Sequence, residues 1–87
     1  MYKVLIVEDD KTIASLVKKH LESWGYEVEY VRDFSHVLTE FVKMDPQLVL
    51  LDLKLPYYNG FYWCDEIRRI SQVPIIFLSS ASDNMNM

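Results

Sequence analysis

The sequence contains few of the residues that define several common protein classes. It has one cysteine, Cys64, so no disulfide can form within the chain, and we expect a reducing, cytoplasmic location. Only two of its 87 residues are glycine and three are proline, and the sequence has no internal repeat or low-complexity tract. No apolar run approaches the roughly 20 residues of a membrane helix, so we expect no membrane span.

An excess of positive charge is also absent. The chain has nine lysines and arginines and 13 acidic residues, so its net charge is −4. This charge argues against nucleic-acid binding by this segment itself. Hydrophobic residues make up 51 % of the chain and charged residues 25 %, as in globular proteins. The length suits one small domain, so we predict a single domain over residues 1–87.

Segments of strand character alternate with segments of helical periodicity. The predicted strands are 4–7, 26–31, 48–51 and 73–78, and apolar spacings of three and four predict helices over 10–24, 34–42 and 61–70. Asp10 or Thr12 is expected to cap the first helix, and Gly25 to end it in a left-handed conformation. Asp45-Pro46 ends the second helix, and a fourth helix is expected to begin near Asp83. This order predicts an α/β fold with a parallel sheet covered on both faces.

Polar residues follow three of the predicted strands directly. Glu8 and Asp9 end the first, Asp52 follows the third, and Ser79 and Ser80 end the fourth. Because parallel strands end at one edge of the sheet, we expect these side chains to converge there. Clustered carboxylates repel one another unless a cation joins them, and an all-oxygen donor set favours Mg²⁺ or Mn²⁺. A carboxylate beside such a metal can act as a nucleophile toward a phosphoryl group.

The motifs resemble those of one signalling family. Val7-Glu8-Asp9-Asp10, Leu50-Leu51-Asp52-Leu53-Lys54-Leu55-Pro56, Asn59-Gly60 and Pro74-Ile75-Ile76-Phe77-Leu78-Ser79-Ser80 look like the receiver domain of bacterial two-component response regulators. The resemblance covers the whole chain in order, and its combined spacing is specific. It implies a flavodoxin-like, doubly wound parallel sheet with strand order 2-1-3-4 and the fifth strand missing. The receiver domain is therefore expected to be incomplete at its C-terminus.

The resemblance also implies a role for each matching residue. Asp52 would accept a phosphoryl group from a phosphohistidine of a sensor histidine kinase. Asp9, Asp52 and the backbone carbonyl of Lys54 would bind Mg²⁺, and Glu8 would help through water. Ser79 would supply the switch hydroxyl, and the Ser80 amide would contact a phosphoryl oxygen. Pro56 and Gly60 would shape the adjacent loop.

The family resemblance extends to what such a protein does. It implies a phosphoacceptor, not a turnover enzyme, that controls transcription through a C-terminal winged-helix DNA-binding domain absent from this sequence. The sequence further resembles regulators of cell-envelope stress and antibiotic sensing in Gram-positive bacteria. The family's lysine after the fifth strand is absent here, which leaves phosphorylation of this chain open. An uncovered fourth strand also predicts self-association.

Other functions compete with a phosphorylated receiver. The chain is alternatively an interaction module of the same fold that takes no phosphate. An aspartyl phosphatase usually has a second acid two residues after its nucleophile, where this chain has Lys54. A flavin-binding protein of this topology needs a phosphate loop after the first strand, and Glu8-Asp9-Asp10 would repel a phosphate there. His20 and His36 are predicted to lie on helices, away from the strand ends.

Overall fold

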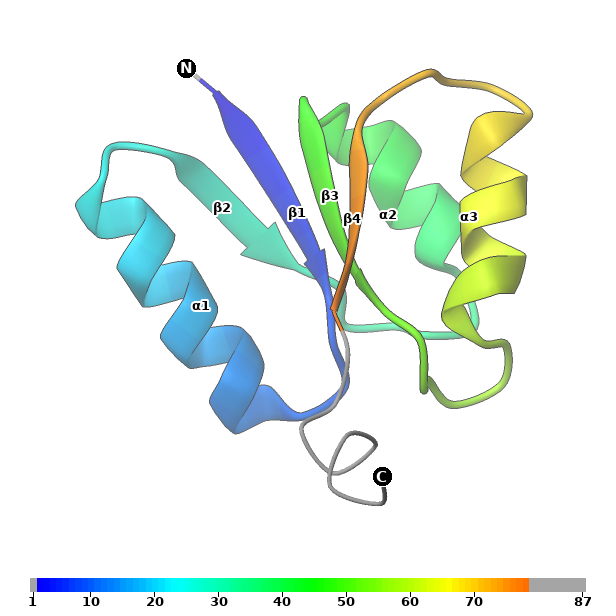
Figure 1. Cartoon of the computed structure of the whole chain (residues 1–87), viewed down its shortest axis with the longest axis horizontal. Coiled ribbons are helices and arrows are strands. Elements are labelled where there is room, and N and C mark those ends of the chain that lie inside the picture. The colour runs from blue at the N-terminus through cyan, green and yellow to red at the C-terminus, as the bar shows by residue number, and fades with distance from the viewer. Residues whose placement is uncertain (1, 79–87) are drawn as a thin grey trace.

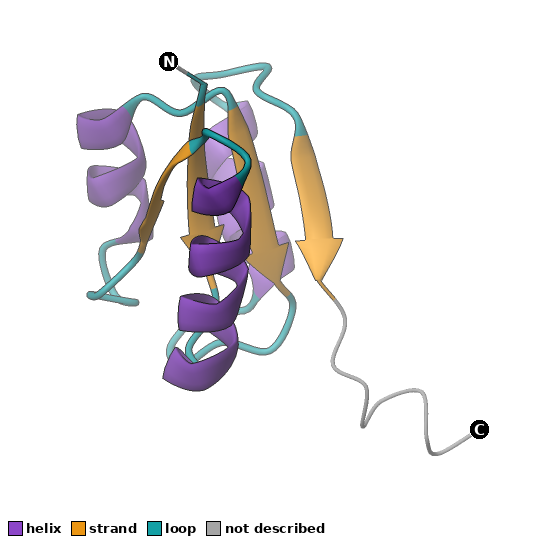
Figure 2. Ribbon diagram, turned by 90° about the vertical axis from the view of Figure 1, so that its left-hand side faces the viewer, coloured by secondary structure: helices purple, strands orange, loops and turns teal. Residues whose placement is uncertain are grey.

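A computed structural model, which describes residues 2–78, shows four parallel strands and three helices in strict alternation. The sheet order is β2-β1-β3-β4, as predicted, with α1 on one face and α2 and α3 on the other (Figures 1 and 2). The elements are β1 (Lys3–Val7), α1 (Lys11–Ser23), β2 (Glu27–Tyr30), α2 (Val37–Met44), β3 (Leu48–Asp52), α3 (Gly60–Arg68) and β4 (Ile75–Leu78). The expected helix near Asp83 lies outside the described residues.

The central strands are buried on both faces, as their unbroken apolar runs predict. Alternate residues of β1 enter two separate cores, because successive side chains of a strand point to opposite faces. Val4 and Ile6 pack beneath α1 with Ala14, whereas Leu5 and Val7 pack beneath α2 and α3. All four apolar residues of β1 are at most 2 % exposed. Burying side chains of this size stabilises the fold by about 1.5–3 kcal/mol each.

The ends of α1 follow directly from local sequence. Asp10 is the N-cap, and its Oδ1 accepts the backbone N–H groups of Thr12 at 3.0 Å and Ile13 at 3.2 Å. At the other end Gly25 has φ +93°, as predicted for a left-handed terminating residue. The N–H groups of Gly25 and Tyr26 then bond back to carbonyls in the last turn. Of the two candidate caps, the structure therefore selects Asp10.

The second helix begins later than its apolar spacing predicts. Phe34 precedes the helix and is half-buried against the core, since Asp33 Oδ1 accepts the N–H of Ser35 and forms a turn before Val37. His36 is the N-cap of α2 and lies in the loop after β2, so its predicted placement on a helix is wrong. Competition from a local side-chain hydrogen bond explains this shift.

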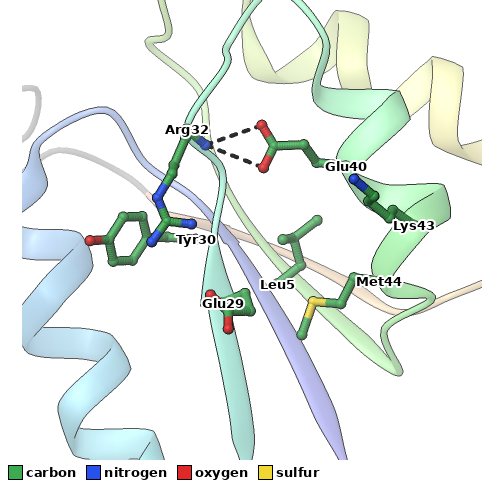
Figure 3. A pocket seen from close by; sticks show the side chains of 7 residues that line it. All are labelled: Leu5, Glu29, Tyr30, Arg32, Glu40, Lys43 and Met44. Carbon is green, nitrogen blue, oxygen red and sulfur yellow. Dashed lines mark hydrogen bonds between the residues drawn. The ribbon is translucent and has the colours of Figure 1, made fainter.

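A carboxylate holds this β2–α2 loop against the helix. Glu40 on α2 accepts the N–H of Asp33 at 2.8 Å. It also accepts the N–H of Arg32 at 3.2 and 3.3 Å (Figure 3). These bonds satisfy two backbone N–H groups that lie beyond the end of β2 and so have no partner in the sheet. Below these bonds, Leu5 and Met44 line the bottom of an open groove between β2 and α2 (Figure 3).

The last two elements differ from prediction at their ends. The third helix starts at Gly60, where the Asn59 side chain accepts the N–H of Tyr62 at 2.9 Å, and it ends before Ile70. The fourth strand starts at Ile75 rather than at 73, because Pro74 has no N–H to donate to the sheet. Within residues 2–78 no strand pairs with the outer edge of β4, where Ile76 is 52 % exposed.

Gly60 allows the start of α3 to lie against the end of β3. Its N–H donates to the carbonyl of Leu53 at 2.9 Å, which closes the loop between the two elements. A Cβ at this position would meet the carbonyl oxygen of Asp52 and the backbone of Leu53. Both obstacles are main-chain atoms that cannot rotate away. Only glycine therefore permits this close approach.

We expect Gly60→Ala to lower the free energy of unfolding by about 1–3 kcal/mol, because the added methyl group must displace backbone at the end of β3. Urea denaturation followed by circular dichroism measures this change. Asp65→Asn, at an exposed position on the same helix, is the control and should leave the urea midpoint unchanged. An unchanged urea midpoint for Gly60→Ala would contradict the proposed steric cause.

Candidate functional site

Three carboxylates meet at the C-terminal edge of the two central strands. Glu8 and Asp9 directly follow β1, and Asp52 is the last residue of β3. One carboxylate oxygen from each residue lies within 4.8 Å of the others. The parallel register that pairs Val7 with Leu51 brings the two strand ends to the same level. Among the described residues, no other group of three or more His, Cys, Asp or Glu side chains meets in this way.

Two of these acids are removed from water. Glu8 is 8 % exposed and Asp52 is 7 % exposed, whereas Asp9 is exposed. Burial raises the pKa of Glu8 above its usual range, and the neighbouring charges of Asp52 and Asp9 raise it further. The N–H of Asp10 donates to Glu8 Oε2 at 3.0 Å, which opposes that rise by favouring the ionised form.

Local structure fixes the position of each carboxylate. The first turn of α1 follows the acids at once, and Asp10, which caps it, also bonds through its N–H to Glu8. Asp52 is fixed by β3, because its partner across the sheet is Leu78 on β4. Because Gly60 has no Cβ to collide with the Asp52 carbonyl, the following loop can lie against the same edge. The strand ends that carry the three carboxylates are thus placed by backbone contacts between elements distant in sequence.

The chemistry of these donors suits a hard divalent cation. Carboxylate oxygens are the ligands that Mg²⁺ and Mn²⁺ prefer, and the cluster contains no imidazole or thiolate that would favour zinc. Burial is the main cause of the raised pKa of Glu8, and a cation would offset the repulsion from Asp52 and Asp9 that adds to it. The residues present therefore fit the predicted metal.

The remaining predicted site residues lie on the loop after β3 or beyond the described chain. Lys54 follows Asp52 by two residues and is exposed, in the loop that leads to α3. Ser79 and Ser80 are outside the described residues. Sequence reasoning assigned Gly60 to the loop but did not detect its contact with the Asp52 carbonyl, which becomes visible only when α3 is docked.

A second cluster near the end of β2 combines serine, histidine and aspartate. Asp33 Oδ2 and Ser35 Oγ approach the same ring nitrogen of His36, Nδ1, at 2.9 and 3.0 Å. A catalytic triad requires the acid and the nucleophile on opposite ring nitrogens. Hydrogen bonds from Ser35 and His36 lower the pKa of the exposed Asp33. This cluster is a loop-closing hydrogen-bond network and not a nucleophilic centre.

Comparison with known proteins agrees with this geometry. The family described as the response regulator receiver domain matches residues 4–87. The chain belongs to this family. It is 51 % identical over 86 residues to the uncharacterized transcriptional regulatory protein YvcP of Bacillus subtilis, and 49 % identical over 84 residues to the response regulator GraR of Staphylococcus epidermidis. These matches include 99 % and 97 % of the residues of this chain. They cover only 36 % of the length of YvcP and 38 % of the length of GraR.

Solved structures show the same receiver fold. The N-terminal domain of the nisin resistance regulator NsrR has a TM-score of 0.87 and 49 % identity, covering 100 % of this chain and 74 % of that one. The response regulator TrrA of Thermotoga maritima in complex with Mg²⁺-BeF has a TM-score of 0.84 and 30 % identity, covering 99 % of this chain and 76 % of that one. A further structure contains TrrA with the histidine kinase ThkA, with a TM-score of 0.81 and 31 % identity, covering 92 % of this chain and 70 % of that one.

The receiver domain's relatives are transcriptional and response regulators, so the predicted family and fold are confirmed. Within residues 2–78, none of the helices has the length and apolar character that crossing a bilayer requires.

Because the clustered acids repel one another, we expect Glu8→Gln and Asp52→Asn each to raise the stability of the metal-free receiver domain. The expected gain is about 1–4 kcal/mol, the range of repulsion between two unit charges roughly 4 Å apart from bulk water to an effective protein dielectric of about 20. Thermal unfolding in EDTA measures it. Asp65→Asn, at an exposed position on α3, is the control and should leave the melting temperature unchanged. Lower stability of both site variants would show that the carboxylates are held by favourable contacts instead.

Proposed function

We propose that Asp52 accepts a phosphoryl group from the phosphohistidine of a sensor histidine kinase. The observation that carries this proposal is the convergence of Glu8, Asp9 and Asp52 within 4.8 Å at the end of the two central strands. Asp52 supplies the nucleophile, and the other two acids come from a different strand. The kinase as donor is supported by the solved complex of TrrA with the histidine kinase ThkA.

The transfer is a displacement at phosphorus. A carboxylate oxygen of Asp52 forms a bond to phosphorus, the P–N bond to the donor imidazole breaks, and the leaving imidazole takes a proton from water. Asp52 attacks through an oxygen of its ionised carboxylate. When bound at this site, Mg²⁺ would neutralise charge on the phosphoryl oxygens. The chain's part is to hold the acceptor carboxylate in place at a rigid strand end.

The proposed metal ligands are Asp9, Asp52 and the backbone carbonyl of Lys54, with Glu8 acting through water. The matching donor chemistry supports this assignment, as does the Mg²⁺-BeF bound to TrrA. In the same proposal Ser79 supplies a hydroxyl to the phosphoryl group, and the Ser80 amide contacts one of its oxygens. These last two roles rest on the resemblance of the sequence to the receiver family.

The output proposed for the full-length protein is transcription control. Its relatives are transcriptional and response regulators, and the chain spans little more than a third of their length. We infer that phosphorylation at Asp52 alters DNA binding by a winged-helix domain elsewhere in such a protein. The receiver would then act in the cytoplasm as a phosphorylated switch and not as a turnover enzyme.

Acetyl phosphate with Mg²⁺ tests the acceptor. We expect the protein to gain the mass of one phosphoryl group, stable in acid and lost in alkali, measured by intact mass spectrometry. Asp52→Asn and Asp9→Asn should abolish the gain, because they remove the nucleophile and a metal ligand. The same mass gain on Asp52→Asn would assign the phosphate to another residue.

Two controls make the result specific. Asp65→Asn should be labelled like the wild type, and EDTA should prevent labelling of both. The experiment is repeated on a chain extended to the length of the matched receiver domains. Labelling of the extended chain alone would show that groups beyond residue 87 are needed, whereas labelling of neither chain would reject the acceptor role.

We further infer that copies of this chain associate through β4. Its strand residues carry no charge, and Phe77 is 40 % exposed with its ring 5.5 Å from that of Phe61, which is 59 % exposed. An apolar edge of this kind pairs with another strand. The opposite edge, β2, presents Glu27 and Glu29, whose charges oppose such pairing between copies.

We therefore expect the mass measured by light scattering to rise with concentration. Ile76→Lys should weaken this association, because it places a charge at the open edge of β4. Leu16→Lys, at a position on α1 that is 62 % exposed, is the matched control and should associate like the wild type. A monomer of constant mass over the whole concentration range would contradict β4 pairing.

A further inference from the structure

The loop after Asp52 contains a strained turn centred on a tyrosine. The N–H of Tyr58 donates to the carbonyl of Pro56 at 2.9 Å, and Tyr57 between them has φ +70°. This combination is a γ-turn of the positive-φ kind, which is rare and strained for any residue with a Cβ. Glycine or asparagine would adopt the conformation more readily. The backbone here does not favour a tyrosine.

The two tyrosines of this turn have different environments. The Tyr58 ring stacks on Tyr62 at 4.2 Å with an interplanar angle of 18°, and it meets the edge of Trp63 at 5.6 Å. Tyr57 is 77 % exposed, and within the described residues it makes no ring contact. Packing of Tyr58 therefore anchors the turn, while Tyr57 projects from it into solvent.

The loop is held beside the proposed phosphoacceptor. The bond from the Gly60 N–H to the Leu53 carbonyl closes the loop at its base, and Gly60 touches the Asp52 carbonyl. Figure 1 shows this β3–α3 loop at the same end of the sheet as the loop that follows β1. Tyr57 is thus fixed at the rim of the site by a short loop.

A protein that phosphorylates Asp52 must cover this rim. Asp52 is 7 % exposed, so a donor histidine has to enter from the C-terminal edge of the sheet, with its surrounding surface against the adjoining loops. A small phosphodonor needs no such contact. An exposed tyrosine suits a protein contact, because it offers a large surface with an apolar body and a polar tip while losing few rotamers on binding.

We propose that the Tyr57 side chain contacts the protein that donates the phosphoryl group to Asp52. This contact speeds transfer from a protein donor and leaves transfer from small-molecule donors unchanged. The strain of the γ-turn is retained because it directs this side chain outward at the rim of the site. This inference rests on the proposed phosphoacceptor role of Asp52. It adds a surface that recognises the partner, distinct from the groups that react.

The test compares two donors on the same variants. One donor is acetyl phosphate, and the other is a sensor-kinase fragment chosen because its phosphohistidine labels the wild-type protein. We expect Tyr57→Asn to lower kcat/KM for transfer from the kinase about tenfold, through KM, as for loss of an interface hot spot. Labelling by acetyl phosphate should be unchanged, and Tyr57→Phe should keep most of the kinase rate.

The melting temperature of Tyr57→Asn distinguishes a loss of partner recognition from a loss of folding. Tyr57→Asn should melt no lower than the wild type, because asparagine relieves the backbone strain. Trp24→Ala is the matched control: this aromatic residue is 65 % exposed and follows α1 at the opposite end of the sheet, so kinase transfer should not change.

Each other outcome overturns the inference in a recognisable way. Equal kinase rates for wild type and Tyr57→Asn would show that the side chain makes no productive contact. Equal losses with both donors would show that Tyr57 supports the site itself rather than the partner. If acetyl phosphate and every sensor-kinase fragment tried fail to label both this chain and the extended chain, the phosphoacceptor role on which the inference depends is rejected instead.

Discussion

The register between β1 and β3 is the constraint on which the site depends. Val7 lies opposite Leu51, so the residues that follow one strand come level with the last residue of the other. Because side chains alternate along a strand, a shift of one residue would point Asp52 toward the other face and break the cluster. The register is specified by Leu5, Val49 and their neighbours, which must all reach buried positions at once. The apolar core thereby positions the acids.

That arrangement has a cost in stability. Glu8 and Asp52 are almost fully removed from water beside each other, which raises the pKa of Glu8 and opposes folding of the charged form. The chain offsets this with strands whose apolar residues are buried on both faces and with a capped first helix. Because the clustered acids destabilise the fold without a cation, binding of a cation at this site should raise the free energy of unfolding. The same electrostatics thus connects stability with the proposed function.

Several features were predictable because they depend on neighbouring residues. The helix stop at Gly25 and the carboxylate cap at the start of α1 are local hydrogen-bond patterns. The start of α2 was predicted too early, since apolar spacing placed Phe34 in the helix while Asp33 formed a competing turn. The positive φ of Tyr57 also escaped sequence reasoning, because tyrosine is a poor indicator of that conformation.

The sequence by itself determined the order of strands and helices, the acids that end the strands and the family resemblance, because each is written in adjacent residues or short periodicities. Tertiary structure alone decided that the three carboxylates come within 4.8 Å, that Gly60 lies against the Asp52 carbonyl and that the Tyr57 side chain is exposed. Those distances join segments more than 40 residues apart or depend on how a loop closes. They are fixed only when the sheet pairs and the helices dock on it.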